Sequence, residues 1–395
     1  MRIGLVLSSP PGYSETFLRS KIKALLEAGH EVVLFTGHRK QATINQPCDV
    51  RFARPVDSRF PILQIFRIGV VLAGLLIRIP LTTQRFWRLE RADGATMRKS
   101  IEGIYINSHI LLEELDWLHF GFTTMALGRQ NVAKAIGSNM ATSFRGYDVS
   151  IYPVKNGFDC YEKIWPKLDK IHTISNGLLD VARKQLGLAK HIPVVKISPA
   201  ISVSGFLGKA EKTDSQGLIR LLTVGRLHWV KGLDYAVEAC FILKEKGLDF
   251  SYTIVGDGES FEHLRFLIHL LDMEDCIFLV GKKEPRDVAD LMRASDIYLQ
   301  PSVSEGFCNA VLEAQAAGLL CIVSDAGGLP ENVVNGETGW VVPKRDSKRL
   351  AERIGEIANS GIAQQRGVRE RGIERVTRDF CIEKHSEKWA KFYSK

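Results

Sequence analysis

Short apolar runs alternate with longer amphipathic segments from the start of the chain. Residues 2–8 form the first apolar run, and an amphipathic segment follows at 14–28, with Ser14 placed to cap a helix and Gly29 placed to end it. A second apolar run covers residues 30–35. This order of strand, loop, helix and strand predicts a parallel sheet with right-handed crossovers. In such sheets the ligand crevice lies beyond the carboxyl ends of the strands.

The same alternation resumes in the second half of the chain, so that it predicts roughly six βα units in all. The later apolar runs cover residues 218–224, 252–255, 277–280, 296–300, 321–324 and 340–342. A chain of 395 residues is too long for one ordinary core. Residues 202–216 are small, polar and charged, which predicts a linker. We therefore expect two α/β domains, 1–204 and 205–379.

Composition indicates a soluble globular protein, because 45% of the residues are hydrophobic and 25% are charged. The seven cysteines are odd in number and scattered, without a CxxC pair or a histidine cluster that would predict zinc. This usage favours a reducing compartment. The N-terminus leads directly into a strand rather than into the pattern of a signal peptide. We expect a cytoplasmic protein.

Charge is distributed unevenly between the two halves. Residues 1–200 contain 27 basic and 16 acidic residues, whereas residues 201–395 contain 26 and 29. Most of the excess lies in residues 51–100, where ten basic residues face three acidic ones. The first half is therefore expected to meet something anionic.

An apolar stretch, residues 60–81, lies inside this basic region. Its longest uncharged run covers only residues 68–77, so we expect it not to cross a bilayer. Two alternatives remain open, a buried helix of the first domain or a basic amphipathic element on a membrane surface. We favour peripheral contact of residues 51–99 with an anionic membrane, although solvated arginines would suit the same composition.

Candidate chemistry is concentrated in residues 302–342. Glu305 and Glu313 stand eight apart, on either side of the turn into an apolar helical segment. A helix start attracts a diphosphate, and a carboxylate two turns further along can accept hydrogen bonds from the hydroxyls of a ribose. Glu305, at the mouth of the same site, can meet a second polyol. The alternative is that Glu313 is an ordinary solvated helix glutamate.

Two cations add to this picture. Arg226 and Lys231 lie at a strand-to-helix turn, held by Gly225 and Gly232, where they can clamp a diphosphate. Gly256 begins a further turn at which the backbone must approach something closely. Together these features predict a pocket for a nucleotide diphospho-sugar. The alternative for the two cations is an ordinary solvated surface.

Several motifs carry a family resemblance. EGFCNAVLE (305–313), SDAGGLPE and NGETGWVV resemble the donor-site signature of family-4 retaining glycosyltransferases of the GT-B fold, including its E-x7-E motif. The resemblance implies two Rossmann-like doubly wound parallel-sheet domains facing across a cleft, the first for the acceptor and the second for the donor. It also implies that residues 380–395 form a helix crossing back to the first domain. Besides Glu313, the donor-binding residues would be Gly306, Phe307, Cys308, Asn309, Gly225 and Gly256.

The first domain carries weaker landmarks. SETF (14–17) resembles the opening of exopolysaccharide-type members, whose first loop faces the acceptor, and only Gly12 can be carried over to that loop. DWLHFG places His119 where the family has a histidine at a strand end. In SFRGYD, Arg145 replaces a more usual histidine ahead of Asp148. Arginine cannot act as a general base, so its role would be electrostatic, towards a phosphate or an anionic acceptor.

Each of these residues also has a plainer alternative. Gly12 would be a turn glycine, His119 a core histidine, and Arg145 an ion-pair partner of Asp148. The first loop lacks GxGxxG, which disfavours a dinucleotide oxidoreductase.

We therefore predict retaining transfer of a sugar from a nucleotide diphospho-sugar to a lipid-linked glycan. We expect this transfer to serve exopolysaccharide or lipopolysaccharide synthesis at the inner face of the cytoplasmic membrane. The catalytic residues would be Glu305, Arg226, Lys231 and His119. We expect no metal, because no DxD-like pair is present, and no other cofactor or nucleic acid. Alternatives are a sugar-nucleotide epimerase, a phosphorylase with a pyridoxal lysine, and a non-catalytic binding protein.

Overall fold

The computed structural model describes residues 1–10, 16–37, 47–57, 59–207 and 217–394. The chain divides into two compact units, one of Met1–Ile197 with His385–Lys395 and one of Ser198–Lys384. The predicted boundary after residue 204 thus falls inside the second unit. The predicted linker, 202–216, lies outside the described residues from position 208 onward.

The first unit contains a seven-stranded parallel sheet of order β3-β2-β1-β4-β5-β6-β7. Strand β1 (Arg2–Leu7) pairs with β2 on one side and β4 on the other, so that Ile3 lies opposite Val32 and Trp117. The other strands are β2 (Glu31–Thr36), β3 (Asp49–Phe52), β4 (Trp117–Phe120), β5 (Asn139–Phe144), β6 (Lys170–Thr173) and β7 (Val194–Lys196). The order reverses at β1, as in Rossmann-like folds.

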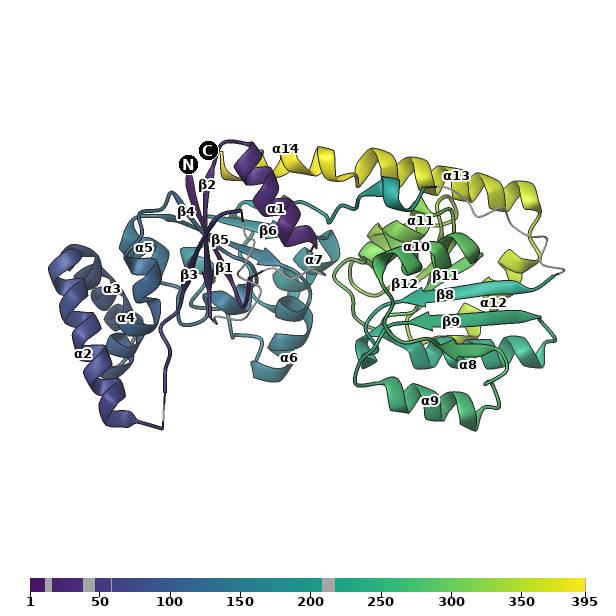
Figure 1. The fold of residues 1–395 in the computed structure, drawn as a ribbon, viewed down its shortest axis with the longest axis horizontal. Helices are drawn as coiled ribbons and strands as arrows, with labels where there is room; N and C mark the ends of the chain where they lie inside the picture. Colours follow the sequence, from purple (N-terminus) through teal and green to yellow (C-terminus); the bar gives the residue numbers. More distant parts are fainter. Residues whose placement is uncertain (11–15, 38–46, 58, 208–216, 395) are drawn as a thin grey trace. The chain divides into compact units, whose positions relative to one another are not determined.

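Two helices far apart in sequence share one core with this sheet, α1 (Thr16–Glu27) and α14 (Ile382–Tyr393) (Figure 1). Leu18, Ile22 and Leu25 of α1 are spaced to form one apolar stripe. Trp389, Phe392 and Tyr393 of α14 are almost fully buried in the same core. The end of the chain is therefore part of the first unit.

Three further helices, α2 (Pro61–Arg78), α3 (Pro80–Ala92) and α4 (Met97–Leu111), pack on one another beside the sheet (Figure 1). Pro80 ends α2 and begins α3, because proline lacks an amide donor and restricts the residue before it. Leu75 is the one buried residue of α2, while Ile62, Ile65 and Ile77 are at least 70% exposed.

These exposures make the buried-helix alternative for residues 60–81 wrong. By length and composition α2 could span a membrane, and among the described residues it is the one helix that meets this test. The unit's remaining helices are α5 (Val132–Ile136), α6 (Tyr152–Asn156) and α7 (Asn176–Gln185), with short turns at Thr123–Ala126, Tyr147–Ile151 and Trp165–Lys167.

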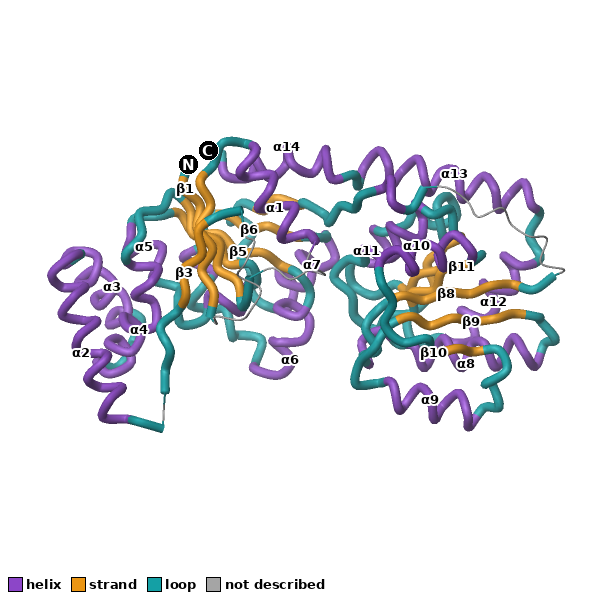
Figure 2. The backbone as a smooth tube through the Cα atoms, viewed as in Figure 1, coloured by secondary structure: helices purple, strands orange, loops and turns teal. Residues whose placement is uncertain are grey.

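The second unit contains a six-stranded parallel sheet of order β10-β9-β8-β11-β12-β13. Figure 2 shows its strands as one layer with helices around it. The strands are β8 (Ile219–Val224), β9 (Phe250–Val255), β10 (Ile277–Leu279), β11 (Ile297–Gln300), β12 (Leu320–Ser324) and β13 (Trp340–Val342). The helices are α8 (Leu233–Glu245), α9 (Phe261–Leu270), α10 (Pro285–Ala294), α11 (Asn309–Ala316), α12 (Ser347–Ala358) and α13 (Ile362–Asp379). Short helical turns occur at Val203–Gly205, Trp229–Lys231 and Leu329–Glu331. The prediction of two doubly wound parallel sheets is confirmed.

Candidate functional site

The candidate site lies at the carboxyl ends of β8 and β11, which are neighbours in the second sheet. Lys231 follows β8 and Glu305 follows β11, and their side chains form an ion pair with Nζ 2.5 Å from the Glu305 Oε2. Both side chains are largely buried. Burial lowers the pKa of Lys231, but the Glu305 carboxylate outweighs that effect and the pKa stays above its ordinary value. The structure therefore brings these two predicted residues together as a charged pair.

A series of buried polar side chains is linked to Glu305 by hydrogen bonds. The Tyr298 hydroxyl donates to Gln300 Oε1 (3.0 Å), and the Gln300 amide donates to Ser302 Oγ (2.8 Å). Ser302 Oγ in turn lies 3.4 Å from Glu305 Oε2. These groups fix the carboxylate through a network that excludes water. Sequence reasoning missed all three supporting residues, because Tyr298 and Gln300 lie within an apparently ordinary buried strand.

The loop that carries Glu305 is held by glycines. Gly327 has a φ of 54°, and a Cβ there would lie 2.2 Å from the Glu305 carbonyl oxygen. The Gly328 amide donates to that same oxygen at 2.9 Å. Only glycine permits this approach of two backbone segments. The Gly-Gly pair of the sequence motif thus positions the backbone of Glu305.

Helix α11 starts immediately after this loop. No side chain caps α11 at Cys308, the residue before its first turn. The Cys308 amide donates to Asn332 Oδ1 (3.1 Å), and Asn332 Nδ2 donates to the Cys308 carbonyl (2.8 Å). Asn332 is fully buried and fixes the helix start from a neighbouring loop. Because its amide is already bonded, Cys308 cannot offer that donor to a phosphate, which leaves the next amides of the helix, from Asn309 onward.

The other residues of this stretch have distinct surroundings. Gly306 is buried, and Phe307 packs on Phe380 with ring centroids 5.7 Å apart. Burial raises the pKa of the Cys308 thiol to about 12, and its Sγ lies 3.4 Å from Gln300 Oε1. The thiol therefore belongs to the interior and is unsuited to act as a nucleophile.

Glu313 lies on α11 and differs from an ordinary solvated glutamate. Burial raises its pKa to about 7, and its carboxylate has no hydrogen-bond partner within the described ranges. A half-buried acceptor without a partner is suited to a ligand hydroxyl. The ribose contact of Glu313 stays a prediction.

Arg226 is exposed, and its charge lies close enough to Lys231 to act on the pKa of that lysine. Gly225 and Gly256 pack directly on each other, since a Cβ on Gly256 would lie 1.8 Å from the Gly225 carbonyl oxygen and its φ is 146°. The predicted close approach at Gly256 is therefore an approach to the loop carrying Arg226. It stabilises that loop.

In the first unit the structure places His119 away from any solvent. Its ring is fully buried, with Nε2 2.8 Å from Ser143 Oγ and Nδ1 2.7 Å from the Tyr393 hydroxyl. The Lys21 ammonium lies 3.2 Å from the same ring. A substrate could not reach this imidazole while α14 covers it. We correct the catalytic assignment accordingly, and His119 is a packing residue beneath α14.

Asp148 and Arg145 organise the turn after β5. Asp148 is fully buried, and its oxygens accept from the backbone amides of Thr123, Arg145 and Gly146. The Arg145 guanidinium donates to the Gly121 carbonyl and lies 4.0 Å from the ring of Phe17, so the two side chains do not form the ion pair considered above. With both oxygens engaged by backbone, Asp148 is a turn-forming residue and its acceptor assignment is corrected.

Arg145 remains at the carboxyl edge of the sheet. Gly12 lies outside the described residues. Among the residues that the structure describes, no group of three histidine, cysteine or acidic side chains gathers to hold a metal ion.

Comparison with known proteins shows which family part of this chain resembles. Residues 209–375 match the family model of glycosyl transferases group 1. The putative colanic acid biosynthesis glycosyltransferase WcaL of Escherichia coli (strain K12) is 27% identical over 396 residues, 96% of each chain. The amylovoran biosynthesis glycosyltransferase AmsK of Erwinia amylovora is 27% identical over 361 residues, 86% of each chain.

Among solved structures, Anabaena Alr3699/HepE in complex with UDP aligns with a TM-score of 0.73 over 99% of this chain and 98% of that chain, at 14% identity. This likeness bears on the fold, which is of the GT-B type. The second unit of the chain therefore carries a glycosyl transferases group 1 region, within a two-domain GT-B fold.

Proposed function

We propose that the chain is a retaining glycosyltransferase of family 4, which moves a sugar from a nucleotide diphospho-sugar to a lipid-linked glycan in exopolysaccharide synthesis. One observation carries this proposal, namely that Lys231 and Glu305 form an ion pair just before α11, while Glu313, about one turn into that helix, has no hydrogen-bond partner among the described residues. The names of the relatives WcaL and AmsK and the UDP bound to HepE support the same reading.

In the proposed reaction the bond between the anomeric carbon and the β-phosphate oxygen breaks, and a bond from the acceptor hydroxyl oxygen to that carbon forms on the same face. The acceptor proton passes to the departing phosphate oxygen. Negative charge grows on the diphosphate, and Lys231, Arg226 and the amides of α11 stabilise it. No enzymic nucleophile is required.

Lys231 and Glu305 neutralise each other in the absence of donor, which avoids leaving two buried charges unpaired. We propose that the donor diphosphate takes over the Lys231 ammonium and that the sugar hydroxyls take over the Glu305 carboxylate. Glu313 then binds the ribose. Metal-independent transfer stays a prediction, which activity in the presence of EDTA would test.

Helix α2 supports a peripheral membrane position. Its exposed apolar side chains include Ile62, Ile65 and Phe66, and the neighbouring α3 exposes Arg85, Arg88 and Arg91. An apolar surface with cationic neighbours fits a layer of anionic lipid. We propose that this face contacts the inner surface of the cytoplasmic membrane.

The test of the proposed function uses Glu305→Gln and Lys231→Ala, with transfer assayed from UDP-, GDP- and ADP-sugars. Removing one donor to a developing oxyanion costs about 10²–10³-fold in rate, so Lys231→Ala should lose at least that much. Glu305→Gln should also lose transfer, because the amide no longer offers the sugar hydroxyls a charged acceptor. Lys244→Ala is the matched control, because Lys244 forms an exposed ion pair with Asp275 in the same unit. Circular dichroism of each variant checks that the fold is kept.

Turnover like that of the parent protein in either site variant would overturn the assignment. Conversion of the donor to an isomer without acceptor would indicate an epimerase, and the absorbance of a pyridoxal group would indicate a phosphorylase. Donor binding without any turnover would indicate a non-catalytic binding protein.

A further inference from the structure

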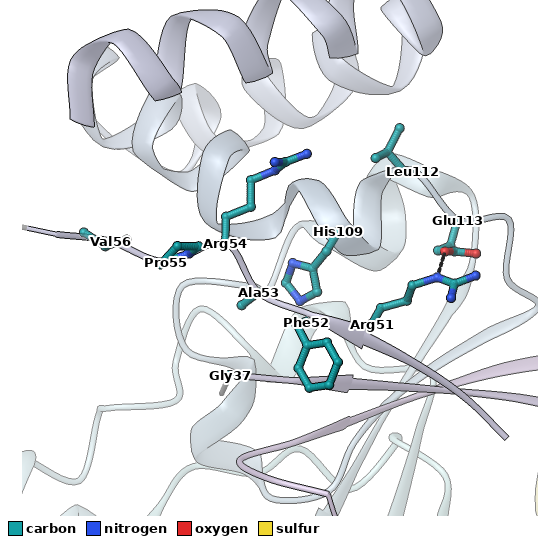
Figure 3. A pocket seen from close by; sticks show the side chains of 10 residues that line it. All are labelled: Gly37, Arg51, Phe52, Ala53, Arg54, Pro55, Val56, His109, Leu112 and Glu113. Atoms are coloured by element: carbon teal, nitrogen blue, oxygen red, sulfur yellow. Dashed lines mark hydrogen bonds and ion pairs between the residues drawn. The ribbon is translucent and has the colours of Figure 1, made fainter. Parts of the chain in front are cut away.

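The first unit contains a cavity of about 860 Å³ between the end of β3 and helix α4, separate from the residues described above. Figure 3 shows the His109 ring of α4 lying next to Ala53 and Phe52, the Arg54 side chain extending away from that ring, and the Arg51–Glu113 ion pair at one side. A second cavity, of about 320 Å³, shares Gly37, Ala53 and His109 with the first. It lies at the carboxyl ends of β1 and β2, where parallel sheets bind their ligands.

Three polar atoms around the second cavity are buried without a hydrogen-bond partner. They are Thr36 Oγ1, His109 Nδ1 and Arg129 Nε. Thr36 is only 2% exposed. A buried polar atom without a partner is destabilising, and three of them at one site are unlike an ordinary protein interior. All three can donate once the imidazole is protonated, so they are suited to one oxyanion.

The charges around the cavities also favour an anionic ligand. Arg51 is paired with Glu113, which also pairs with Arg2. Arg54 donates to Ser108 Oγ and Arg129 donates to the Met125 carbonyl, and within the described part of the chain neither has a carboxylate partner. Two guanidinium groups without a carboxylate partner therefore act on the charge of the His109 imidazole, Arg129 more strongly than Arg54.

This environment lowers the pKa of the His109 imidazole. Burial, followed by the charge of Arg129 and a smaller effect of Arg54, lowers the pKa of His109 to about 4. An anion between the three groups would remove the repulsion and favour the protonated ring.

We propose that these joined cavities bind a phosphate or diphosphate group, through Arg54, Arg129, Thr36 and His109. This inference rests on the proposed function, because the group would be the diphosphate that links the acceptor glycan to its lipid. The wall of the larger cavity continues through Pro55 and Val56 towards α2, whose apolar side chains are exposed. A lipid attached to the bound diphosphate would thus leave the cavity beside that apolar helix.

The experiment titrates His109 by NMR, with the imidazole assigned through His109→Gln, in the presence of inorganic pyrophosphate. We expect the pKa of His109 to rise from about 4 towards the ordinary histidine value when pyrophosphate binds. Arg54→Gln should weaken pyrophosphate binding about 10–100-fold, the range of a hydrogen bond to a charged group. Arg98→Gln is the matched control, because Arg98 is 88% exposed and pairs with Glu102 on the same face of α4.

A second series compares pyrophosphate with farnesyl diphosphate for the parent protein and for Phe66→Ser on α2. Tighter binding of farnesyl diphosphate, reduced by Phe66→Ser, assigns the site to a lipid diphosphate. If both probes bind equally, the oxyanion site is supported and its ligand is a soluble phosphate. Equal losses in the Arg54 and Arg98 variants, or an unchanged His109 titration, would overturn the proposal.

The measurement of donor binding is independent of the measurement of pyrophosphate binding. Binding of a nucleotide diphospho-sugar depends on the second unit, so Arg54→Gln should leave the thermal shift produced by the donor unchanged. A parent protein that binds the donor but does not bind pyrophosphate would reject this inference and leave the proposed function intact.

Discussion

Asn332→Ala is expected to damage the start of α11 more than any single change at the predicted donor residues. Asn332 is fully buried and makes two hydrogen bonds to the backbone of Cys308, at 3.1 and 2.8 Å. Alanine would leave one buried amide and one buried carbonyl without partners. At about 1–3 kcal/mol for each unsatisfied group, the free energy of unfolding should fall by about 2–6 kcal/mol.

Asn332→Asp separates the two bonds. A carboxylate can still accept from the Cys308 amide but cannot donate to the Cys308 carbonyl, and it places a buried negative charge against that oxygen, so the loss at neutral pH should be at least as large as in Asn332→Ala. The measurement is urea unfolding of the second unit, followed by tryptophan fluorescence. Donor binding is measured by calorimetry at a temperature where both variants are folded, and we expect it to be weaker in both because α11 no longer starts at a fixed place.

Asn335→Ala is the matched control. The side chain of Asn335 accepts one hydrogen bond, from the Val341 amide at 2.9 Å, in an exposed position of the same loop. A loss in Asn332→Ala no greater than in Asn335→Ala would refute the claim that two buried bonds hold the helix start. Unchanged donor affinity in a destabilised Asn332→Ala would show that α11 does not bind the donor.

Three further predictions follow from buried groups. Because burial raises the pKa of Glu313 to about 7, donor affinity should rise about tenfold between pH 6 and pH 8 as the carboxylate forms, and Glu313→Gln should remove that dependence in calorimetry. Burial, with the charge of Arg145, lowers the pKa of Lys21 well below its ordinary value, so the folded state binds fewer protons than the unfolded state and stability falls as the pH drops below about 10. Lys21→Met should make the protein about 1–4 kcal/mol more stable in urea at pH 7 and flatten this dependence. Trp389→Ala, which opens a cavity against Lys21 and His172, should cost about 3–5 kcal/mol in the unfolding of the first unit.

The meeting of Lys231 and Glu305 could be predicted from the sequence for a clear physical reason. Each residue follows an apolar run that becomes a strand, and the carboxyl ends of neighbouring parallel strands lie at one edge of the sheet. The placement of Glu313 after Glu305 likewise depends on a short loop and on the first turn of α11, both local in sequence. Such relations are local or follow from the sheet order, so residue types and intervals suffice to predict them.

The supporting residues could not be predicted in this way. Asn332 holds Cys308 across 24 positions of sequence, and Gln300 supports Glu305 from within a strand. Neither residue type is unusual in a loop or strand, and neither lies in a pattern with a known chemistry. Their importance depends on which backbone groups they meet, and this is decided by tertiary packing.

His119 shows why a correct local structure led to an incorrect role. The sequence predicts a strand at 116–121, and β4 covers Trp117–Phe120, so the residue does stand near a strand end. What covers that end is α14, whose Tyr393 bonds the imidazole across 274 positions of sequence. The amphipathic spacing of α14 predicts that its apolar face is buried, but not against which strand. A catalytic role needs an open approach, and openness is a property of the whole packed unit. The rings of His119 and His172, packed against Trp389 of α14, therefore belong to the core that holds the chain's end on the first sheet.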